Sequence, residues 1–302
     1  MSGTAVTIGA YDGVHLGHRA LLRDLSARAA TRGLSTVVVT FDRHPASVVR
    51  PESAPPQLTD LEQKIELLEA CGIDRTVVIA FDRSRADESA EDFVKEVLVD
   101  RLKARLVVVG EDFHFGHGRK GNVALLTELG RQYDFEVVGA RLTGDGTDAV
   151  SSTRIRTLVA AGDVVGAAQL LGRPHEVRGR IVHGDGRGGP DLGFPTANFE
   201  IGDDIALPAD GIYAGYFTRA DGTVHPAAVS VGRRPTFYQP GTASVLVEAY
   251  LLDFDGDLYG EKSRVNFVER LRGDEKFESV DALIAQMRQD AADAERVLSA
   301  GN

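Results

Sequence analysis

The first half of the chain alternates short apolar runs with longer amphipathic stretches. Four of the runs are rich in β-branched residues, a composition typical of buried parallel strands. A shorter apolar run, "VTIG" (6–9), precedes them and predicts a further strand. The four longer runs are "TVVVTF" (36–41), "TVVIAF" (76–81), "LVVVG" (106–110) and "FEVVGA" (135–140).

The stretches between these runs carry apolar residues at helical spacing. They predict helices over about 16–32, 60–71, 89–103 and 122–133. Strands and helices in alternation predict an open α/β sheet with helices on both faces. One more helix is expected over about 153–171, capped by "SST" (151–153) and ended by Gly172 and Pro174.

The pattern changes after Pro174, where turn residues become frequent and short alternating strands appear. The pair of strands around "RADGT" (219–223) predicts a hairpin, and the last apolar pattern predicts a helix over about 279–299. This half is therefore expected to form an antiparallel β-barrel with a terminal helix. Its predicted strands are "EVRGRIV", "GIYAGYF", "PAAVSVG", "SVLVEAYLLDF" and "SRVNFVE". We expect two domains, 1–173 and 174–302.

Composition narrows the classes of partner. The 302 residues carry a formal net charge of -11, and no Lys/Arg-rich stripe suited to nucleic acid is visible. No run is long and apolar enough to span a membrane, and "MSGTAVTIGA" lacks the elements of a signal peptide. Cys71 is the single cysteine; we expect it to pack in a helix, in a protein of the reducing cytoplasm.

The segment "GAYDGVHLGH" (9–18) follows the first predicted strand and begins a helix. Ligands of open α/β sheets bind beyond the carboxyl ends of the strands. Gly9 and Gly17 allow a phosphate to approach the backbone, and the helix start offers unpaired N–H groups. His15 and His18 lie one turn apart on the same side of that helix, where they can donate hydrogen bonds to a phosphate.

Two other interpretations of the histidine pair stay open. A metal site is one, although zinc-binding helices usually space their histidines at i and i+4 with a glutamate. The other gives one histidine a capping role and leaves the second exposed. The glycines that surround the pair favour phosphate.

A second glycine-rich segment, "HGDGRGGPDLGFPTANF" (183–199), lies in the second half. It lacks the P-loop pattern, and such loops are often surface turns, but its N–H groups are suited to cover phosphates. Thr196 and Asn198 point to one side if the chain is extended, and their oxygens suit Mg²⁺, although such a pair is more often found in ordinary turns. Glu248 stands in an apolar alternating strand, either on the solvent face or inside a site.

Several of these motifs resemble those of one family. "TIGAYDGVHLGH" is similar to the H-x-G-H signature of nucleotidyltransferases, and "GFPTAN" is similar to the signature of riboflavin kinases. In this order they resemble the prokaryotic bifunctional riboflavin kinase/FMN adenylyltransferase (FAD synthetase) family over almost the whole chain. The other matching segments are "VVTFDRHP" (38–45), "VVVGEDFHFGHGRKGN" (107–122), "VSSTRIR" (150–156), "GIYAG" (211–215), "VSVGRRPTF" (229–237) and "VEAYLLDFDGDLYGE" (247–261).

For residues 1–173 the resemblance implies a Rossmann-like nucleotidyltransferase domain that converts FMN and ATP to FAD and pyrophosphate. His15 and His18 would hold the α-phosphate region, and Asp112 and Phe113 would meet the flavin. The resemblance implies that ATP and its phosphates are bound by Gly9, Asp12, Gly17, Ser152, Thr153 and Arg156. The last three would bind the departing pyrophosphate. Ser152 as a simple helix cap and Phe113 as a core residue remain alternatives.

For residues 174–302 it implies a kinase that phosphorylates riboflavin to FMN. Glu248 would act as base on the ribityl 5′-hydroxyl, which attacks the γ-phosphate of ATP, with Mg²⁺ on Thr196 and Asn198. "DLYG" and "RLRGDEKF" (270–277) would shape the flavin pocket and its lid. The residues expected to cover the ATP phosphates are Gly184, Asp185, Gly186 and Gly188. Small molecules are the expected partners, not nucleic acid or membranes; self-association stays open.

The chain departs from the family pattern at Ala10, Arg43 and His114, and its glycine loop is one residue longer. One alternative is therefore a riboflavin kinase with a weak or silent adenylyltransferase. Another is a flavin-binding regulator or storage protein without turnover. An RNA-binding relative of the H-x-G-H synthetases is disfavoured by the acidic charge.

Overall fold

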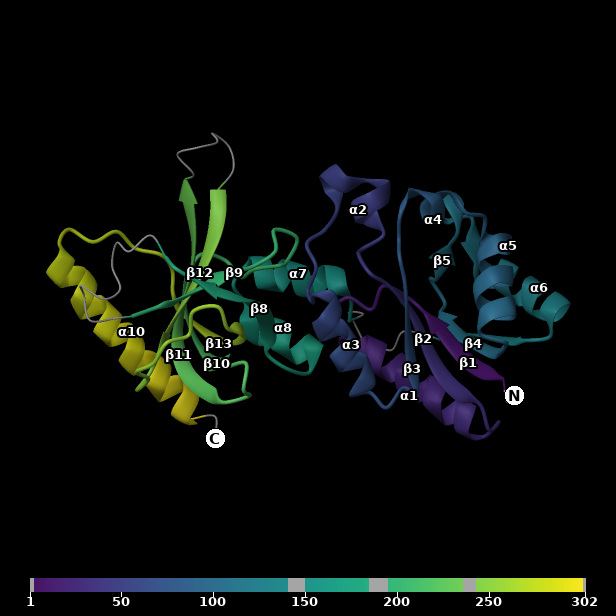
Figure 1. Cartoon of the computed structure of the whole chain (residues 1–302), viewed down its shortest axis with the longest axis horizontal. Helices are drawn as coiled ribbons and strands as arrows, with labels where there is room; N and C mark the ends of the chain where they lie inside the picture. Colours follow the sequence, from purple (N-terminus) through teal and green to yellow (C-terminus); the bar gives the residue numbers. More distant parts are fainter. Residues whose placement is uncertain (1–2, 141–149, 185–194, 236–242, 301–302) are drawn as a thin grey trace. The chain divides into compact units, whose positions relative to one another are not determined.

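The chain divides into two compact units, Met1–Ser152 and Thr153–Asn302. The computed structural model describes residues 3–140, 150–184, 195–235 and 243–300. Figure 1 draws these residues as ribbons, and each unit is described below by itself.

The first unit is built on a five-stranded sheet in which every pair of neighbouring strands is parallel. The strand order is β3-β2-β1-β4-β7, so β1 lies in the centre. The strands are β1 Thr4–Ile8, β2 Ser35–Phe41, β3 Arg75–Ile79, β4 Ala104–Gly110 and β7 Glu136–Ala140. The predicted parallel α/β sheet is confirmed.

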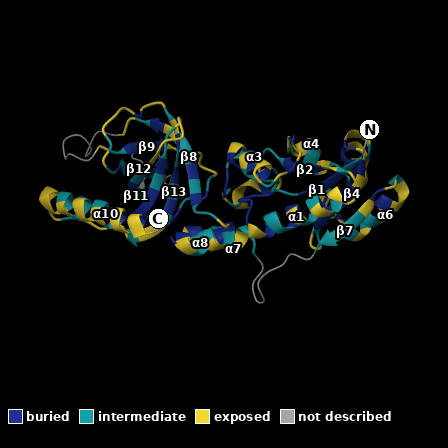
Figure 2. Ribbon diagram, turned by 90° about the horizontal axis from the view of Figure 1, so that it is seen from below, coloured by how far each residue is buried: buried dark blue, intermediate teal, exposed yellow. Residues whose placement is uncertain are grey.

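Helices cover both faces of this sheet because successive strand residues point to opposite sides. On β1, Ala5 packs with one apolar cluster, while Val6 and Ile8 pack with the other. Figure 2 shows buried strands between helices whose outer sides are exposed. The Ala5 face is covered by α1 Leu16–Ala30 and α3 Leu61–Glu69; the other face by α5 Ala90–Phe93, η2 Val94–Arg101 and α6 Val123–Tyr133.

Some details differ from the sequence prediction. The helix expected over 89–103 is present, but from Val94 onward its hydrogen bonding is that of a π-helix. Cys71 lies in the turn after α3 rather than within a helix, and its thiol donates to Leu67 O at 3.2 Å. Short elements that the pattern did not predict are α2 Ala46–Val49, η1 Pro51–Ser53, α4 Arg83–Asp87, β5 His114–Phe115, η3 His117–Arg119 and β6 Gly121–Asn122.

The single helix expected over 153–171 is wrong: two helices occupy this stretch, α7 Ser152–Ala160 and α8 Val164–Leu171. Gly162, with φ +79°, adopts the left-handed conformation that ends a helix. Asp163 then caps α8 by accepting a hydrogen bond from Gly166 N at 2.8 Å. The predicted end at Gly172 is confirmed, with φ +71° at that residue.

The second unit contains a closed six-stranded antiparallel barrel in the order β10-β11-β12-β9-β8-β13. Tyr213, Phe217 and Phe267 are fully buried and belong to its apolar core. The predicted hairpin at 219–223 is confirmed, since Arg219 N donates to Thr223 O at 2.9 Å. The strands are β8 His175–Val182, β9 Ala197–Glu200, β10 Gly211–Thr218, β11 Val224–Pro235, β12 Ala243–Leu251 and β13 Lys262–Arg272.

The terminal helix α10, Val280–Ala300, lies on the outside of this barrel. Ala294 and Leu298 of the helix pack against Ala214 and Ala228 of the strands. Small residues on the strands allow the helix to lie close to the sheet. The predicted barrel with a terminal helix is confirmed.

Candidate functional site

The loop between β1 and α1 has an unusual backbone. Tyr11, Gly13 and Val14 all have positive φ, at 50°, 81° and 38°. For a β-branched residue such as Val14 this conformation is a genuine outlier, and strain of this kind is concentrated at functional sites. The buried Tyr11 hydroxyl lies 2.6 Å from Thr7 Oγ1, which fixes the loop to the strand that precedes it.

Asp12 anchors the same loop to the segment before α3. Its buried carboxylate accepts hydrogen bonds from Leu58 N at 2.8 Å and from Thr59 N at 3.2 Å. Gly13 N donates in turn to Thr59 Oγ1 at 3.2 Å. These bonds hold the loop in place and bury the Asp12 carboxyl group.

His15 and His18 lie at the start of α1 with their rings stacked, 3.6 Å between centroids. His15 is the N-cap residue of the helix, and its Nδ1 accepts from His18 N at 3.3 Å. His18 Nδ1 is buried and has no hydrogen-bond partner among the described residues. Burial, together with the neighbouring His15, lowers the pKa of His18 well below its ordinary value, so His18 is neutral at pH 7.

Ser152, the last residue of the first unit in the sequence, contacts the loop between β1 and α1. Its hydroxyl donates to Asp12 O at 2.9 Å, and it is the first residue of α7. A side chain at Gly17 would lie 3.2 Å from the His15 ring and 3.3 Å from Val150 O. Glycine therefore allows residues 150–152 to approach the start of α1.

Thr153 and Arg156 follow Ser152 on α7, one turn apart and therefore on the same side of the helix. They are among the first residues of the second unit. Their part in a phosphate site stays a prediction. Gly9, at the other end of the loop, donates its N–H to Val39 O at 3.1 Å.

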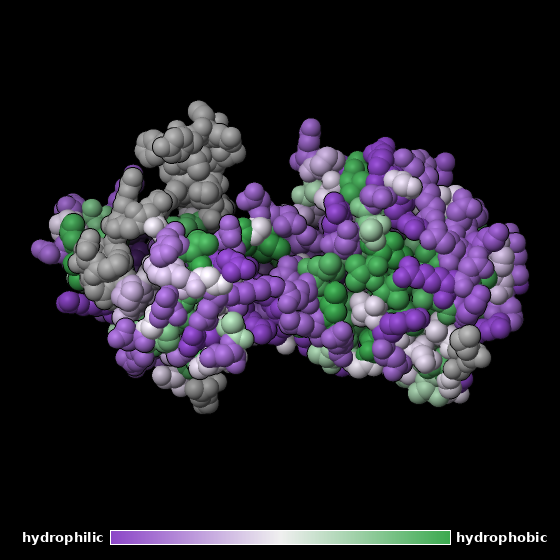
Figure 3. Space-filling view, in the orientation of Figure 1, coloured by the Kyte–Doolittle hydropathy of each residue, from purple (hydrophilic) through white to green (hydrophobic). Residues whose placement is uncertain are grey.

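The predicted flavin residues follow β4. Asp112 is exposed, and its carbonyl oxygen lies 2.7 Å from His114 Nδ1. Phe113 is half-buried and stacks on Phe115 with 5.3 Å between ring centroids, so part of its surface belongs to the core. Figure 3 shows further apolar side chains gathered on the first unit below α2.

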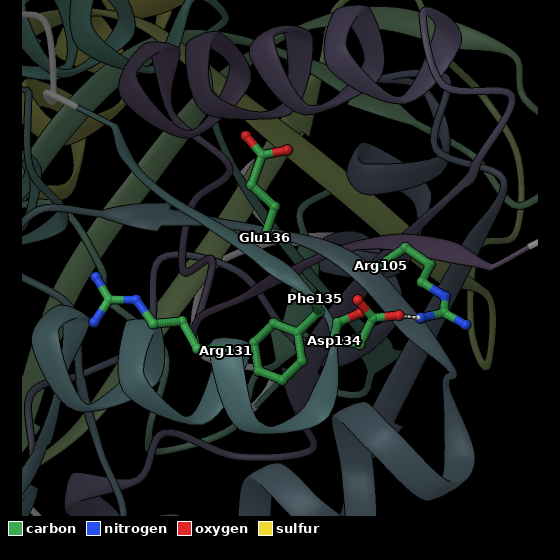
Figure 4. A pocket seen from close by; sticks show the side chains of 6 residues that line it. Arg105, Arg131, Asp134, Phe135 and Glu136 are labelled. Atoms are coloured by element: carbon green, nitrogen blue, oxygen red, sulfur yellow. Dashed lines mark hydrogen bonds and ion pairs between the residues drawn. The ribbon is translucent and has the colours of Figure 1, made fainter.

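A hollow with several charged side chains lies elsewhere on this unit (Figure 4). Arg105 near the start of β4, which forms an ion pair with Asp134, and Glu136 at the start of β7 help to line it. The amino ends of the strands therefore border this hollow, whereas the loop with His15 follows the carboxyl end of β1. Its lining is Arg105, Gly130, Arg131, Asp134, Phe135 and Glu136.

In the barrel, strand register brings two predicted residues together. Glu248 on β12 is directly opposite Asn198 on β9, and Ser230 on β11 is opposite Glu248 on the other side. Their neighbours Val247 and Ala249 point into the apolar core. Alternation therefore places Glu248 and Asn198 side by side on the outer face of the barrel.

Asn198 is almost completely buried, although its side chain is polar. It is 6% exposed, and its Oδ1 is buried with no hydrogen-bond partner among the described residues. Its Nδ2 donates to Thr196 O at 3.3 Å. A side chain at Gly184 would come within 2.7 Å of Asn198 Nδ2, so glycine there leaves the Asn198 amide in its present position. Asp185, Gly186 and Gly188 lie outside the described residues.

The stretches that the structure describes contain no group of three or more His, Cys, Asp or Glu residues arranged to hold a metal. Among these described residues, His15 and His18 are therefore not part of a group of three or more potential metal ligands. Within the same stretches, no helix combines the length and apolar character needed to cross a membrane.

Sequence reasoning missed Lys64, which the fold buries beside the loop after β1. A signal was present in the sequence. Lys64 has Leu61 and Leu68 three and four residues away, so it belongs to the apolar face of its helix. A lysine at such a position is almost never fully buried without a partner.

Fold and sites together define a class of protein. A parallel α/β unit with a histidine pair after its first strand is joined to an antiparallel barrel with a carboxylate beside a buried asparagine. These features together are typical of a two-domain enzyme that binds nucleotides.

Comparison with known proteins identifies the family. Residues 1–154 match the FAD synthetase family, and residues 171–298 match the riboflavin kinase family. Bifunctional riboflavin kinase/FMN adenylyltransferases from Escherichia coli K12 and Pseudomonas fluorescens are 36% and 38% identical to this chain. The matches cover 95% and 99% of this chain, and 90% and 94% of those proteins.

A crystal structure of a protein from Streptococcus pneumoniae, titled a macrolide-efflux protein, is also similar. It has a TM-score of 0.85 and 30% identity, and the match covers 98% of this chain and 95% of that one. The chain belongs to the bifunctional riboflavin kinase/FMN adenylyltransferase family.

Proposed function

We propose that this enzyme phosphorylates riboflavin to FMN and then adenylylates FMN to FAD, each step with its own ATP. The observation that carries the proposal is that two motif clusters, each in its own half of the chain, match two enzyme families in succession. We assign residues 1–173 to adenylyl transfer and 174–302 to the kinase. The compact units divide between Ser152 and Thr153, and the family matches leave 155–170 between them.

In the adenylyl transfer, a phosphate oxygen of FMN attacks the α-phosphorus of ATP and pyrophosphate leaves. His15 and His18, beside the start of α1, hold the α-phosphate region and stabilise the charge that develops there. Ser152, Thr153 and Arg156 bind the departing pyrophosphate, because hydroxyls and a guanidinium at a helix start suit an anion.

The flavin ring of FMN needs an apolar partner. The half-buried ring of Phe113 and the carbonyl end of β4 supply one, with Asp112 close to it in the chain. The loop residues Gly9, Asp12 and Gly17 shape the phosphate site, Asp12 through its bonds to Leu58 and Thr59.

In the kinase reaction, Glu248 accepts the proton of the ribityl 5′-hydroxyl as the hydroxyl oxygen attacks the γ-phosphorus of ATP, and ADP leaves as its bond to that phosphorus breaks. Asn198 and Thr196 would hold Mg²⁺, which fits an Asn198 oxygen that lacks a partner among the residues the structure describes. Bound there, Mg²⁺ would supply positive charge to neutralise the phosphate oxygens during transfer. Gly184 begins the loop that covers the phosphates, with Asp185, Gly186 and Gly188 next in the chain.

The reaction is proposed to take place in the reducing cytoplasm, which suits a chain with a single cysteine. The test is to incubate the protein with riboflavin, ATP and Mg²⁺ and to separate the flavins by chromatography. FMN should appear first and FAD afterwards. Absence of FMN rejects the kinase, and FMN without FAD, even when FMN is supplied, favours the kinase with a silent adenylyltransferase.

A further inference from the structure

Lys64 is a buried cation that the reaction described above does not use. It lies in the first turn of α3 and is 4% exposed. Its Nζ donates a hydrogen bond to Phe41 O, the last carbonyl of β2, at 2.8 Å. Lys64 thus reaches the carboxyl edge of the sheet, beside the loop that follows β1.

Two carboxylates act on this ammonium. One belongs to Asp12 in the loop after β1, and the other to Asp42, the first residue after β2. Burial lowers the pKa of Lys64, and both carboxylates oppose that shift. Asp42 is itself held by Phe81 N, which donates to its Oδ1 at 2.8 Å.

The charge of Asp12 creates a problem for a phosphate site. Asp12 is 5% exposed and lies in the loop that carries His15, where the triphosphate of ATP is proposed to bind. A buried carboxylate there repels phosphate, because charges interact strongly away from water. The ammonium of Lys64, on which the Asp12 carboxylate acts, offsets this repulsion.

We propose that Lys64 is a positioning residue for adenylyl transfer, which binds the end of β2 and offsets the charge of Asp12 so that the loop accepts ATP. This inference rests on the proposed function of the first unit. It assigns Lys64 to the binding of ATP rather than to the chemical step.

The test is Lys64→Met, which keeps the length of the side chain and removes its charge. In FAD formation from supplied FMN, the KM for ATP should rise about tenfold, with a smaller change in kcat. Riboflavin phosphorylation by the same preparation should stay within about twofold of wild type, because that site is in the second unit. Lys103→Met, which removes an exposed lysine, is the matched control and should leave both activities unchanged.

The variant Lys64→Met/Asp12→Asn separates charge from packing. An asparagine oxygen can still accept the bonds from Leu58 and Thr59, so the loop keeps its anchor while both charges are gone. The KM for ATP should then recover most of the loss. No recovery, or an unchanged KM in Lys64→Met, overturns the inference.

If Lys64→Met does not fold, Lys64→Arg keeps the charge and should retain a KM for ATP within about threefold of wild type. A tenfold rise in that variant, too, overturns the inference. If the wild-type protein itself makes no FAD from FMN, the proposed function of the first unit fails instead.

Discussion

His15 and His18 are stacked with 3.6 Å between their ring centroids, so protonation of both rings would place two positive charges close together and is unfavourable. A proton on His15 opposes a proton on His18, and burial of His18 adds to that cost. His18 is therefore neutral in the free protein, and its Nδ1 has no hydrogen-bond partner among the described residues. The phosphate that we propose to bind there would supply both a hydrogen-bond partner and the negative charge that stabilises the imidazolium.

The lowered pKa of His18 predicts how stability depends on pH. The unfolded chain binds a proton at His18 below about pH 6.5, whereas the folded protein does so only at much lower pH. The free energy of unfolding should therefore fall as pH drops below this value, by up to about 1.4 kcal/mol per pH unit from this residue. Urea unfolding between pH 8 and pH 5 measures it, and His18→Gln should show a shallower fall. Parallel curves for the two proteins contradict the assignment.

A substitution of Glu248 that replaces one carboxylate oxygen with nitrogen tests its proposed role as the base of the kinase reaction. Glu248→Gln keeps the shape of the side chain on β12 but removes the proposed base, so riboflavin phosphorylation should drop about 10²- to 10⁴-fold. FAD formation from supplied FMN should stay at the wild-type rate. A kinase rate close to wild type would assign Glu248 to the solvent face without a catalytic role.

Among the elements, α10 depends on one ion pair as well as on its apolar face. Arg272 at the end of β13 forms two hydrogen bonds with Asp290 of the helix, at 2.8 and 2.7 Å. Gln286 adds a bond to the same carboxylate at 2.9 Å. Arg272 also lies over the ring of Phe277, so the pair links the barrel, the helix and the segment that follows β13.

Removal of this pair should loosen the terminal helix. Asp290 is 5% exposed, so Asp290→Ala leaves a largely buried guanidinium unpaired. The free energy of unfolding of the second unit should fall by roughly 2–3 kcal/mol. Asp293→Ala, which breaks an exposed pair with Arg296 on the same helix, should have a much smaller effect in the same urea titration. Equal effects of the two substitutions would show that the Arg272 pair has no special role.

For the whole molecule, the separation of the two motif clusters predicts independent activities. Glu248→Gln should make FAD only from supplied FMN, and His15→Ala/His18→Ala should stop at FMN. A mixture of the two variants should make FAD from riboflavin, because FMN released by one protein can bind to the other. Chromatography of the flavins follows each case. If the mixture fails while each variant keeps its remaining activity, FMN is not released between the two steps.

The sequence by itself determined the α/β sheet, the barrel and the approximate positions of most strands, because side-chain alternation and turn residues are local signals. The short strand β9 of the barrel was not predicted. Its motifs also identified the histidine pair, Glu248 and Asn198 as candidates. The sequence contains a signal for the helix break at Gly162, because a glycine there precedes the capping residue Asp163. The apolar pattern continues across this position, and it therefore predicted a single helix.

Only the tertiary structure decided which candidates meet. Register set Glu248 opposite Asn198, and the approach of Val150 to Gly17 brought Ser152 to Asp12. Lys64 became a candidate only when its helix was packed beside the ends of β1 and β2. Such contacts join residues far apart in the chain, so no local pattern carries them; they arise when apolar faces are buried and the polar groups caught between them must find partners.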